Sequence, residues 1–256
     1  MGGVLSRPAP QVPGQELREF HYTPGDFEHA RRLLYQQAGI SLSATKEQMV
    51  YSRLARRLRS LRLCSFADYF NYLAVHEEEW QQFINALTTN LTAFFRENHH
   101  FEMLAAHVRK HAHQHRPLRI WCSASSTGEE PYSLAMTVIE ALDSFTPAVE
   151  IIASDIDTGV LSVARNGIYP EERIELLEPA RKKRFFLRGK GGQSGKVRVR
   201  PELQALIEFR QINLLDSNWG IEPGLDVIFC RNVMIYFDKA TQNKILERMV
   251  HLLRPD

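Results

Sequence analysis

The sequence is poor in cysteine and has no long apolar run. Its three cysteines, Cys64, Cys122 and Cys230, are an odd number at wide spacing, and they form no Cys-x-x-Cys pair. This pattern predicts reduced thiols in a cytoplasmic protein rather than a disulfide framework or a zinc site. No stretch approaches the roughly 18 apolar residues that a membrane span requires, so we expect no direct insertion into a membrane.

An excess of charge of either sign is also absent. The 256 residues include 32 Lys and Arg against 30 Asp and Glu, so the net charge of +2 does not by itself indicate a partner. With 44% hydrophobic and 24% charged residues, the composition is that of a globular protein long enough for one large domain and a small one. We interpret a group of histidines as a basic, solvated helix end and expect no metal. The group is His107, His111, His113 and His115.

The first 89 residues divide into a tail and a helical region. Residues 1–20 are rich in proline and lack the apolar core of a signal peptide, so we expect a disordered tail. Residues 21–89 carry helix signals and almost no strand signals. Thr23 and Pro24 begin a helix that Gly39 ends, and three further apolar segments at helical spacing follow. This region is predicted to be a small all-α domain.

Strand-like and helical segments alternate from residue 118 to residue 256, after a predicted linker helix over residues 90–117. Apolar runs at Leu118–Cys122, Val149–Ala153 and Leu225–Cys230 each precede a helical segment. This alternation predicts a parallel sheet with ligand sites at the carboxyl ends of its strands. Four glycines and a β-like stretch interrupt the alternation over about residues 185–209, where we expect a small inserted hairpin.

The turn after the first of these strands, Ser123 to Gly128, consists of small residues and precedes a helix. Small side chains let a ligand approach the backbone, and a helix N-terminus offers free N–H groups. A phosphate loop would have lysine after the glycine, whereas Glu129 and Glu130 follow here and would attract a cation. Asp155 ends the next strand, where a ribose diol is normally held. S-Adenosylmethionine, which is cationic and has no phosphate, fits this pattern, but two acids that merely cap backbone would fit it equally.

Four blocks of the sequence resemble signatures of the chemotaxis receptor methyltransferases, the CheR family. They are Asn90-Leu91-Thr92-Ala93-Phe94-Phe95-Arg96, Ser126-Thr127-Gly128-Glu129-Glu130-Pro131-Tyr132-Ser133, Ala153-Ser154-Asp155-Ile156-Asp157 and Phe229-Cys230-Arg231-Asn232-Val233-Met234-Ile235-Tyr236-Phe237. The resemblance implies an α/β protein: a Rossmann-like methyltransferase domain over residues 118–256 with an inserted antiparallel β-subdomain, preceded by a small all-α domain. Family members normally continue with further strands after the helix that ends this sequence, so we expect those strands to be missing and an edge to be exposed.

The resemblance also implies an activity and a set of site residues. The activity is methyl transfer from S-adenosylmethionine to glutamate side chains of chemotaxis receptors, with S-adenosylhomocysteine as the product. The residues implied at the cofactor are Asn90, Thr92, Arg96, Glu130, Asp155, Asn213, Leu214, Arg231 and Asn232. Arg96 and Arg231 are expected to orient a carboxylate, with Tyr236 beside the transferring methyl. Because a glutamate is ionised at neutral pH, with an ordinary pKa of about 4.3, we expect neither a general base nor a metal.

A row of arginines is the clearest pattern outside the cofactor site. The row Arg53, Arg56, Arg59 and Arg62 lies on the face of a predicted helix opposite Val50, Leu54, Leu58 and Leu61. No acid occurs between Gln48 and Phe66, so no helix neighbour neutralises the row. Solvation alone explains such a row as well as an acidic partner does. The resemblance favours the cytoplasmic helices of chemotaxis receptors, which makes residues 21–89 a receptor-docking domain.

Two other functions and one further contact stay open at this point. A nucleic-acid methyltransferase would also need a basic row, but Arg231-Asn232-Val233-Met234 lacks the Pro-Pro-aromatic pattern expected for methylating base amino groups, so we expect no nucleic acid. An inactive adaptor that binds cofactor and receptor would keep the same fold, although intact Arg96, Asp155 and Arg231 argue against it. The glycine-rich hairpin resembles the subdomain that binds a receptor's C-terminal pentapeptide in some family members.

Overall fold

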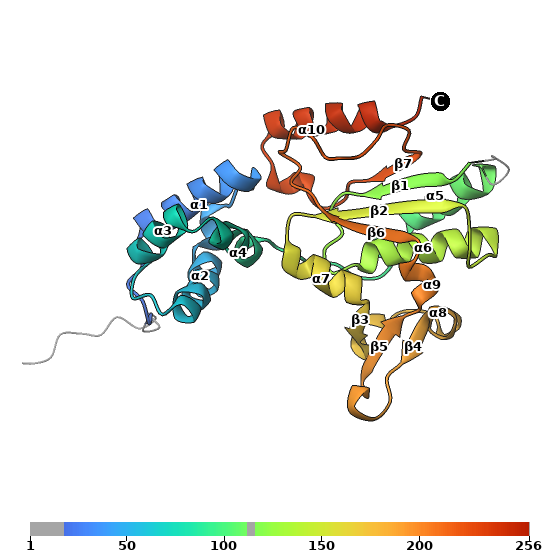
Figure 1. Ribbon diagram of the computed structural model, residues 1–256, viewed down its shortest axis with the longest axis horizontal. Helices are drawn as coiled ribbons and strands as arrows, with labels where there is room; N and C mark the ends of the chain where they lie inside the picture. Colours follow the sequence, from blue (N-terminus) through green and yellow to red (C-terminus); the bar gives the residue numbers. More distant parts are fainter. Residues whose placement is uncertain (1–17, 112–115, 256) are drawn as a thin grey trace, which may run out of the picture.

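The computed structural model describes residues 18–111 and 116–255, which form an all-α part and an α/β part joined by a short segment (Figure 1). Most of the predicted tail lies outside the described residues, as do His113 and His115 of the histidine group. Within the described ranges, no helix is both long and apolar enough to cross a membrane.

The all-α part consists of helices α1 Pro24–Ala38, α2 Glu47–Leu61, α3 Phe66–Val75 and α4 Glu77–Leu87, with a 3-10 turn at Ala44–Lys46. The predicted start and end of α1 are confirmed. Thr23 and Asp26 form a reciprocal capping box at the first turn, and Gly39 closes the last turn with a φ of 67°. These caps satisfy backbone groups that the helix itself leaves unpaired.

A buried ion pair joins α2 to α4 in the middle of this bundle. Glu79 is only 4% exposed, and both of its oxygens accept bonds from the Arg57 guanidinium, at 2.9 and 2.6 Å. The Tyr69 hydroxyl donates to the same carboxylate at 3.0 Å. Burial, together with this carboxylate, raises the pKa of Tyr69, so the phenol stays a donor at any working pH.

The α/β part contains a parallel sheet in the order β6-β2-β1-β7. Its strands are β1 Leu118–Cys122, β2 Val149–Asp155, β6 Ile207–Gln211 and β7 Val227–Phe229. Its long helices are α5 His99–His111, α6 Glu129–Leu142, α7 Thr158–Asn166 and α10 Lys239–Leu252. In Figure 1, α10 lies above the sheet and α6 below it.

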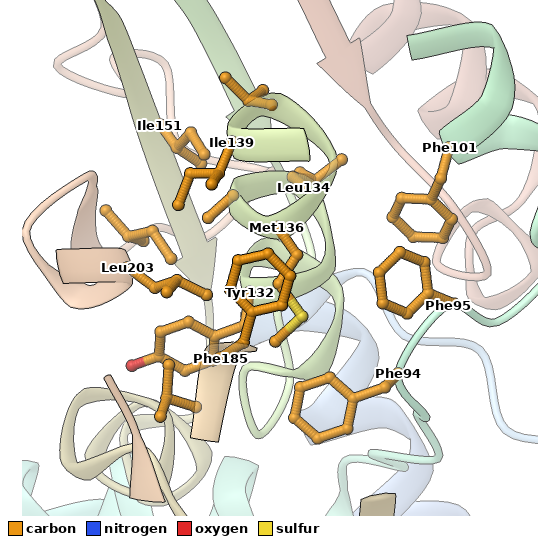
Figure 2. Packing of buried hydrophobic residues seen from close by; sticks show 14 of the residues in the cluster. Phe94, Phe95, Phe101, Tyr132, Leu134, Met136, Ile139, Ile151, Phe185 and Leu203 are labelled. Atoms are coloured by element: carbon orange, nitrogen blue, oxygen red, sulfur yellow. The ribbon is translucent and has the colours of Figure 1, made fainter. Parts of the chain in front are cut away.

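Both faces of the parallel sheet are buried. Because successive side chains on a strand point to opposite faces, neighbouring residues pack in different apolar clusters. On β1, Ile120 and Cys122 belong to the apolar cluster that contains α5 and α6, whereas Trp121 belongs to the cluster that contains α10. Phe94 and Phe95 pack in the first of these clusters, and Figure 2 shows Phe95 against Phe101 beside α6. The segment that carries the first resemblance block is therefore anchored to the main core by its two phenylalanines.

The small antiparallel sheet differs at both ends from the hairpin expected over residues 185–209. It has three strands in the order β3-β5-β4: β3 Ile168–Pro170, β4 Phe186–Arg188 and β5 Lys196–Val199. β3 has only three residues, too few to show an alternating pattern. Residues 207–209 belong instead to β6 of the parallel sheet. The sequence did not predict this, because an isolated alternating run does not reveal which sheet it joins. The helices α8 Pro179–Phe185 and α9 Pro201–Gln204 flank the insertion, with 3-10 turns at Glu171–Ile174 and Gly191–Gln193.

Replacing Arg57 with alanine should destabilise the all-α part strongly, because the buried Glu79 carboxylate would lose its counter-charge. We expect the free energy of unfolding to fall by about 3 kcal/mol. Arg56→Ala is a matched control at the preceding position of α2, where the side chain is exposed, and should change stability by less than about 0.5 kcal/mol. Chemical denaturation followed by circular dichroism measures both. Equal stability of the two variants would contradict this account of the bundle.

Candidate functional site

A cleft of about 940 Å³, which includes the space at its open mouth, lies where the two parts of the chain meet. The carboxyl ends of β1, β2 and β7 reach it from the parallel sheet, as expected for a doubly wound fold. The loop after α1 reaches it from the other side with Ile40 and Leu42. All of the predicted cofactor-binding and catalytic residues line this cleft: Asn90, Thr92, Arg96, Glu130, Asp155, Asn213, Leu214, Arg231, Asn232 and Tyr236.

The turn between β1 and α6 is held in a backbone conformation that needs glycine. Gly128 has a φ of 99°, and a Cβ there would lie 2.8 Å from the Tyr169 hydroxyl. That hydroxyl donates to the Thr127 carbonyl at 2.7 Å, which fixes the turn from outside. Two residues earlier, Ser126 has a φ of 48°, and its N–H points toward β2. The small residues noted in the sequence therefore serve a tight turn as well as an open cleft.

Asp155 ends β2 and presents a carboxylate to the cleft. It is 8% exposed and accepts backbone N–H bonds from Ser126 at 2.8 Å and from Asp157 at 3.0 Å, one to each oxygen. Burial raises the pKa of Asp155 to about 6, although the two backbone N–H groups oppose the shift. Each oxygen keeps a lone pair, so the carboxylate can still accept bonds from a ligand.

Glu130 and Arg231 form a second, largely desolvated pair on the cleft wall. The Arg231 Nη1 donates to Glu130 at 2.6 Å, and its Nη2 donates to the Arg96 carbonyl at 2.6 Å. The buried Cys122 thiol donates to the other Glu130 oxygen at 3.3 Å. Burial raises the pKa of Glu130 in opposition to the positive charge of Arg231. The guanidinium of Arg231 is thus committed to protein groups.

Arg96 is the less restrained of the two cleft arginines. Its Nη1 donates to the Leu91 carbonyl at 2.9 Å, and its Nε lies 3.8 Å from Glu97. About a third of the side chain is exposed, against 9% for Arg231. The flanking backbone is unusual: Phe95, Glu97 and Asn232 all have positive φ angles between 53° and 56°. Such conformations in non-glycine residues tend to cluster at functional sites.

Asn213, Leu214 and Tyr236 complete the far wall. The Asn213 side-chain amide donates to the Gln37 carbonyl at the end of α1, at 2.8 Å. The Tyr236 carbonyl, in the 3-10 turn Met234–Tyr236, accepts from the Ser41 N–H at 2.8 Å. These bonds hold the loop after α1 against the α/β part, so the all-α part forms one side of the cleft.

Several lining residues were missed by sequence reasoning. They are Ala38, Ile40, Leu42, Thr88, Ser126, Ile156, Ile212, Val233 and Phe237. Most are apolar and shape the cleft rather than bond a ligand, so their types carry no chemical signal in the sequence. Ile40 and Leu42 precede the main sheet by about 80 residues, and only the domain arrangement brings them here. Ser126 lies within the second resemblance block, but its hydrogen bond to Asn90, which marks it as a cleft residue, forms only in the folded chain.

One group beside the cleft has the side chains of a metal site. Glu97, His99 and His100 bring ligand atoms within 4.8 Å of one another. The Glu97 carboxylate, however, lies 3.2 Å from the Arg231 guanidinium and accepts from Asn232 at 3.3 Å. A cation there would compete with Arg231 for the same oxygens, so we interpret the group as part of the ion-pair network.

The arginine row is only partly free, contrary to the expectation from α2 alone. Arg53 is half-buried and donates to the carbonyls of Ala86, at 3.1 Å, and of Thr88. Arg59 pairs with Glu19 at 3.1 Å. Spacing along one helix could not reveal these partners, because they come from the end of α4 and from the segment before α1. Arg56 and Arg62 are exposed, and no side-chain partner for either occurs in the part of the chain that the structure describes.

The chemistry of the lining fits S-adenosylmethionine. Arg231 is committed to Glu130 and to the Arg96 carbonyl, and the carboxylates of Asp155 and Glu130 in the lining would repel a phosphate. Asp155 supplies an acceptor for a diol, and Glu130 supplies negative charge near the strand–helix turn. Ile212, Leu214 and Phe237 supply apolar surface for a flat base. A ligand with a ribose, a base and positive charge suits this set, whereas a dinucleotide with its phosphates does not.

Comparisons with known proteins identify the family of the chain. The model described as "CheR methyltransferase, SAM binding domain" matches residues 90–256, and "CheR methyltransferase, all-alpha domain" matches residues 25–88. The chain is 61% identical over 251 residues to Chemotaxis protein methyltransferase 2 of Pseudomonas aeruginosa, covering 98% of this chain and 89% of that protein. It is 51% identical to Chemotaxis protein methyltransferase of Escherichia coli, covering 90% and 80%. The Probable chemotaxis protein methyltransferase of Rhizobium etli is 40% identical, with coverages of 86% and 85%. The chain therefore belongs to the CheR methyltransferase family, with S-adenosylmethionine as its cofactor.

Proposed function

We propose that this protein transfers the methyl group of S-adenosylmethionine to glutamate side chains of chemotaxis receptors, forming methyl esters in the cytoplasm. The observation that carries the proposal is the cleft between the two parts of the chain, which offers the carboxylates of Asp155 and Glu130 to a cationic cofactor and would repel a phosphate. The printed names of relatives up to 61% identical supply the chemotaxis setting.

The cofactor-binding roles follow from the positions of the polar groups. Asp155 would accept bonds from the ribose hydroxyls, and Asn213 and Leu214 would border the adenine. Asn90, Thr92, Glu130 and Asn232 would surround the methionine end, with Arg231 keeping Glu130 in place. When bound, S-adenosylmethionine supplies a methyl group on a positively charged sulfur that a carboxylate can displace.

The acceptor glutamate needs orientation rather than activation, because its carboxylate is already ionised at neutral pH. Of the two candidate arginines, Arg96 is better suited to hold it, since Arg231 is committed to Glu130 and to the Arg96 carbonyl. Tyr236 would line the path of the acceptor. Apolar side chains from both parts of the chain would keep water from the reacting groups, which favours a reaction between opposite charges.

Receptor contact would use two surfaces. The exposed Arg56 and Arg62 of α2 would face the acidic methylation helices, with Arg59 at the edge of the same surface. Arg53 would act differently, because it is bound to the end of α4. The outer edge of β4 in the small sheet is unpaired among the described residues, and we propose it as the place where a receptor's C-terminal pentapeptide could add a strand.

Labelled cofactor tests the activity directly. The protein is incubated with methyl-labelled S-adenosylmethionine and either receptor cytoplasmic fragments or DNA, and the product is treated with mild base. We expect label on the receptor that base releases, as an ester requires. Label on DNA would indicate a nucleic-acid methyltransferase. Cofactor binding with no transfer to any receptor fragment would indicate an inactive adaptor.

The raised pKa of Asp155 gives cofactor binding a specific pH dependence. The ribose hydroxyls need the ionised form, which predominates above a pKa of about 6 and is lost below it. We therefore expect the Kd of S-adenosylhomocysteine to rise roughly tenfold between pH 7 and pH 5, measured by calorimetry. Asp155→Asn should bind more weakly and lose most of this dependence. A wild-type Kd that is constant over this range would remove Asp155 from the binding role.

Removing the hydroxyl of Tyr236 should affect turnover more than cofactor binding. Tyr236→Phe is expected to lower the kcat of receptor methylation by about tenfold or more, because the acceptor loses a group that aligns it. The Kd of S-adenosylhomocysteine should stay within about twofold. Tyr72→Phe, on α3 and outside the cleft, is the matched control and should turn over normally. Full turnover by Tyr236→Phe would show that the hydroxyl has no part in the reaction.

Charge reversal on α2 should weaken receptor docking. In Arg56→Glu/Arg62→Glu, we expect the KM for a receptor fragment to rise on the order of tenfold at low salt, because both side chains would repel an acidic helix. Arg109→Glu/Lys110→Glu makes the same change of charge at the exposed end of α5 and serves as the control. The Kd of S-adenosylhomocysteine should not change in either variant. If both double variants raise the KM equally, α2 is not the docking surface.

A further inference from the structure

Four residues from three separate segments form a closed ring of hydrogen bonds beside the cleft. Asn90 donates from its side chain to Asp157 at 2.8 Å, and the Asp157 N–H donates to Asp155 at 3.0 Å. The Ser126 N–H donates to the other Asp155 oxygen at 2.8 Å, and the Ser126 hydroxyl donates back to the Asn90 carbonyl at 3.0 Å. Three of the four residues line the cleft, whereas Asp157 is 3% exposed behind them.

The two oxygens of Asp157 have different tasks. One oxygen caps α7 by accepting from the N–H groups of Gly159, at 2.8 Å, and Val160, at 3.2 Å. The other oxygen faces away from α7 and accepts from Asn90 and from the Thr88 hydroxyl, the latter at 2.7 Å. A helix cap requires only the first oxygen, so the second is free to hold the segment that leaves the all-α part.

Thr88 is the link from this ring to the all-α part. It follows α4 directly and is 7% exposed. Its carbonyl accepts from Arg53 of α2, and its hydroxyl donates to Asp157. A single residue therefore connects α2 to Asp157, whose carboxylate holds the Asn90 side chain and whose backbone N–H donates to Asp155.

We propose that Thr88 and Asp157 are positioning residues for cofactor binding, through which the all-α part holds Asn90 and Asp155 in place. This inference rests on the proposed cofactor roles of Asn90 and Asp155. Loss of the Thr88 hydroxyl would leave a buried carboxylate oxygen with a single donor. Bonds to a buried charge are stronger than neutral ones, so the carboxylate would turn toward other donors and move Asn90. The shift would reach Asp155 through Ser126, which donates to the Asn90 carbonyl from its hydroxyl and to Asp155 from its N–H.

The docking of the two parts does not depend on Thr88 alone. The Asn85 side chain donates to the Thr158 hydroxyl at 2.9 Å, and Gln81 donates to the Ile156 carbonyl at 2.9 Å. Thr88→Val keeps the shape of the side chain and should therefore fold with its parts together. Thr88→Ser keeps the donor and serves as the rescue variant.

Thr137→Val provides a matched control for deleting a buried threonine hydroxyl. Thr137 is 4% exposed within α6 and donates to the Ser133 carbonyl at 2.8 Å, outside the cleft lining. Calorimetry with S-adenosylhomocysteine and thermal denaturation are run on all four proteins. We expect Thr88→Val to raise the Kd tenfold or more, Thr88→Ser to stay within about twofold of wild type, and Thr137→Val to keep the wild-type Kd whatever its Tm.

Asp157→Asn is a second variant that keeps the α7 cap but turns an amide group toward Thr88 and Asn90. It should raise the Kd at least as much as Thr88→Val. A wild-type Kd in both Thr88→Val and Asp157→Asn would overturn the proposal and leave the cofactor site intact, as would equal weakening by Thr137→Val. Failure of the wild-type protein itself to bind S-adenosylhomocysteine would instead overturn the proposed function.

Discussion

Two carboxylates buried at the end of one strand set the constraint on which the site depends. Asp155 and Asp157 lie two residues apart at the end of β2, and each is less than 10% exposed. Burying them is unfavourable unless donors converge on them. The donors come from the β1–α6 turn, from the start of α7 and from the segment after α4. Satisfying these charges therefore brings the all-α part, the turn and the sheet edge together, and the cleft forms between them.

The two faces of α2 have different contacts, one with the rest of the protein and one with solvent. Arg57 and Arg53 face inward, one neutralising Glu79 and the other fixing the end of α4. Arg56 and Arg62 face solvent and supply the proposed receptor surface. The end of α1 and the loop after it close one side of the cleft through bonds to Asn213 and Tyr236. The part of the chain proposed to meet the receptor is thus also a wall of the cleft proposed to bind the cofactor.

Features of the fold and of the cleft that depend on a short stretch of sequence could be predicted. Caps at Thr23 and Gly39, the parallel sheet and all the predicted cleft residues could be identified, because periodicity, turn chemistry and contiguous family blocks act over short spans. The width of the small sheet, the partners of Arg53 and Arg59, and the bond between Thr88 and Asp157 could not be predicted. Each of these depends on contacts between segments far apart in the chain, and an arginine or threonine bound to a distant carbonyl looks the same in sequence as a free one.

The central claim is that the cofactor lies between the two parts of the chain and is held by both. A crystal structure of the complex with S-adenosylhomocysteine tests it most directly. We predict the ribose hydroxyls within hydrogen-bonding distance of Asp155, with Ile40 or Leu42 and the segment from Thr88 to Thr92 in contact with the same molecule. Ligand density outside the cleft, or contacts confined to the α/β part, would contradict the account.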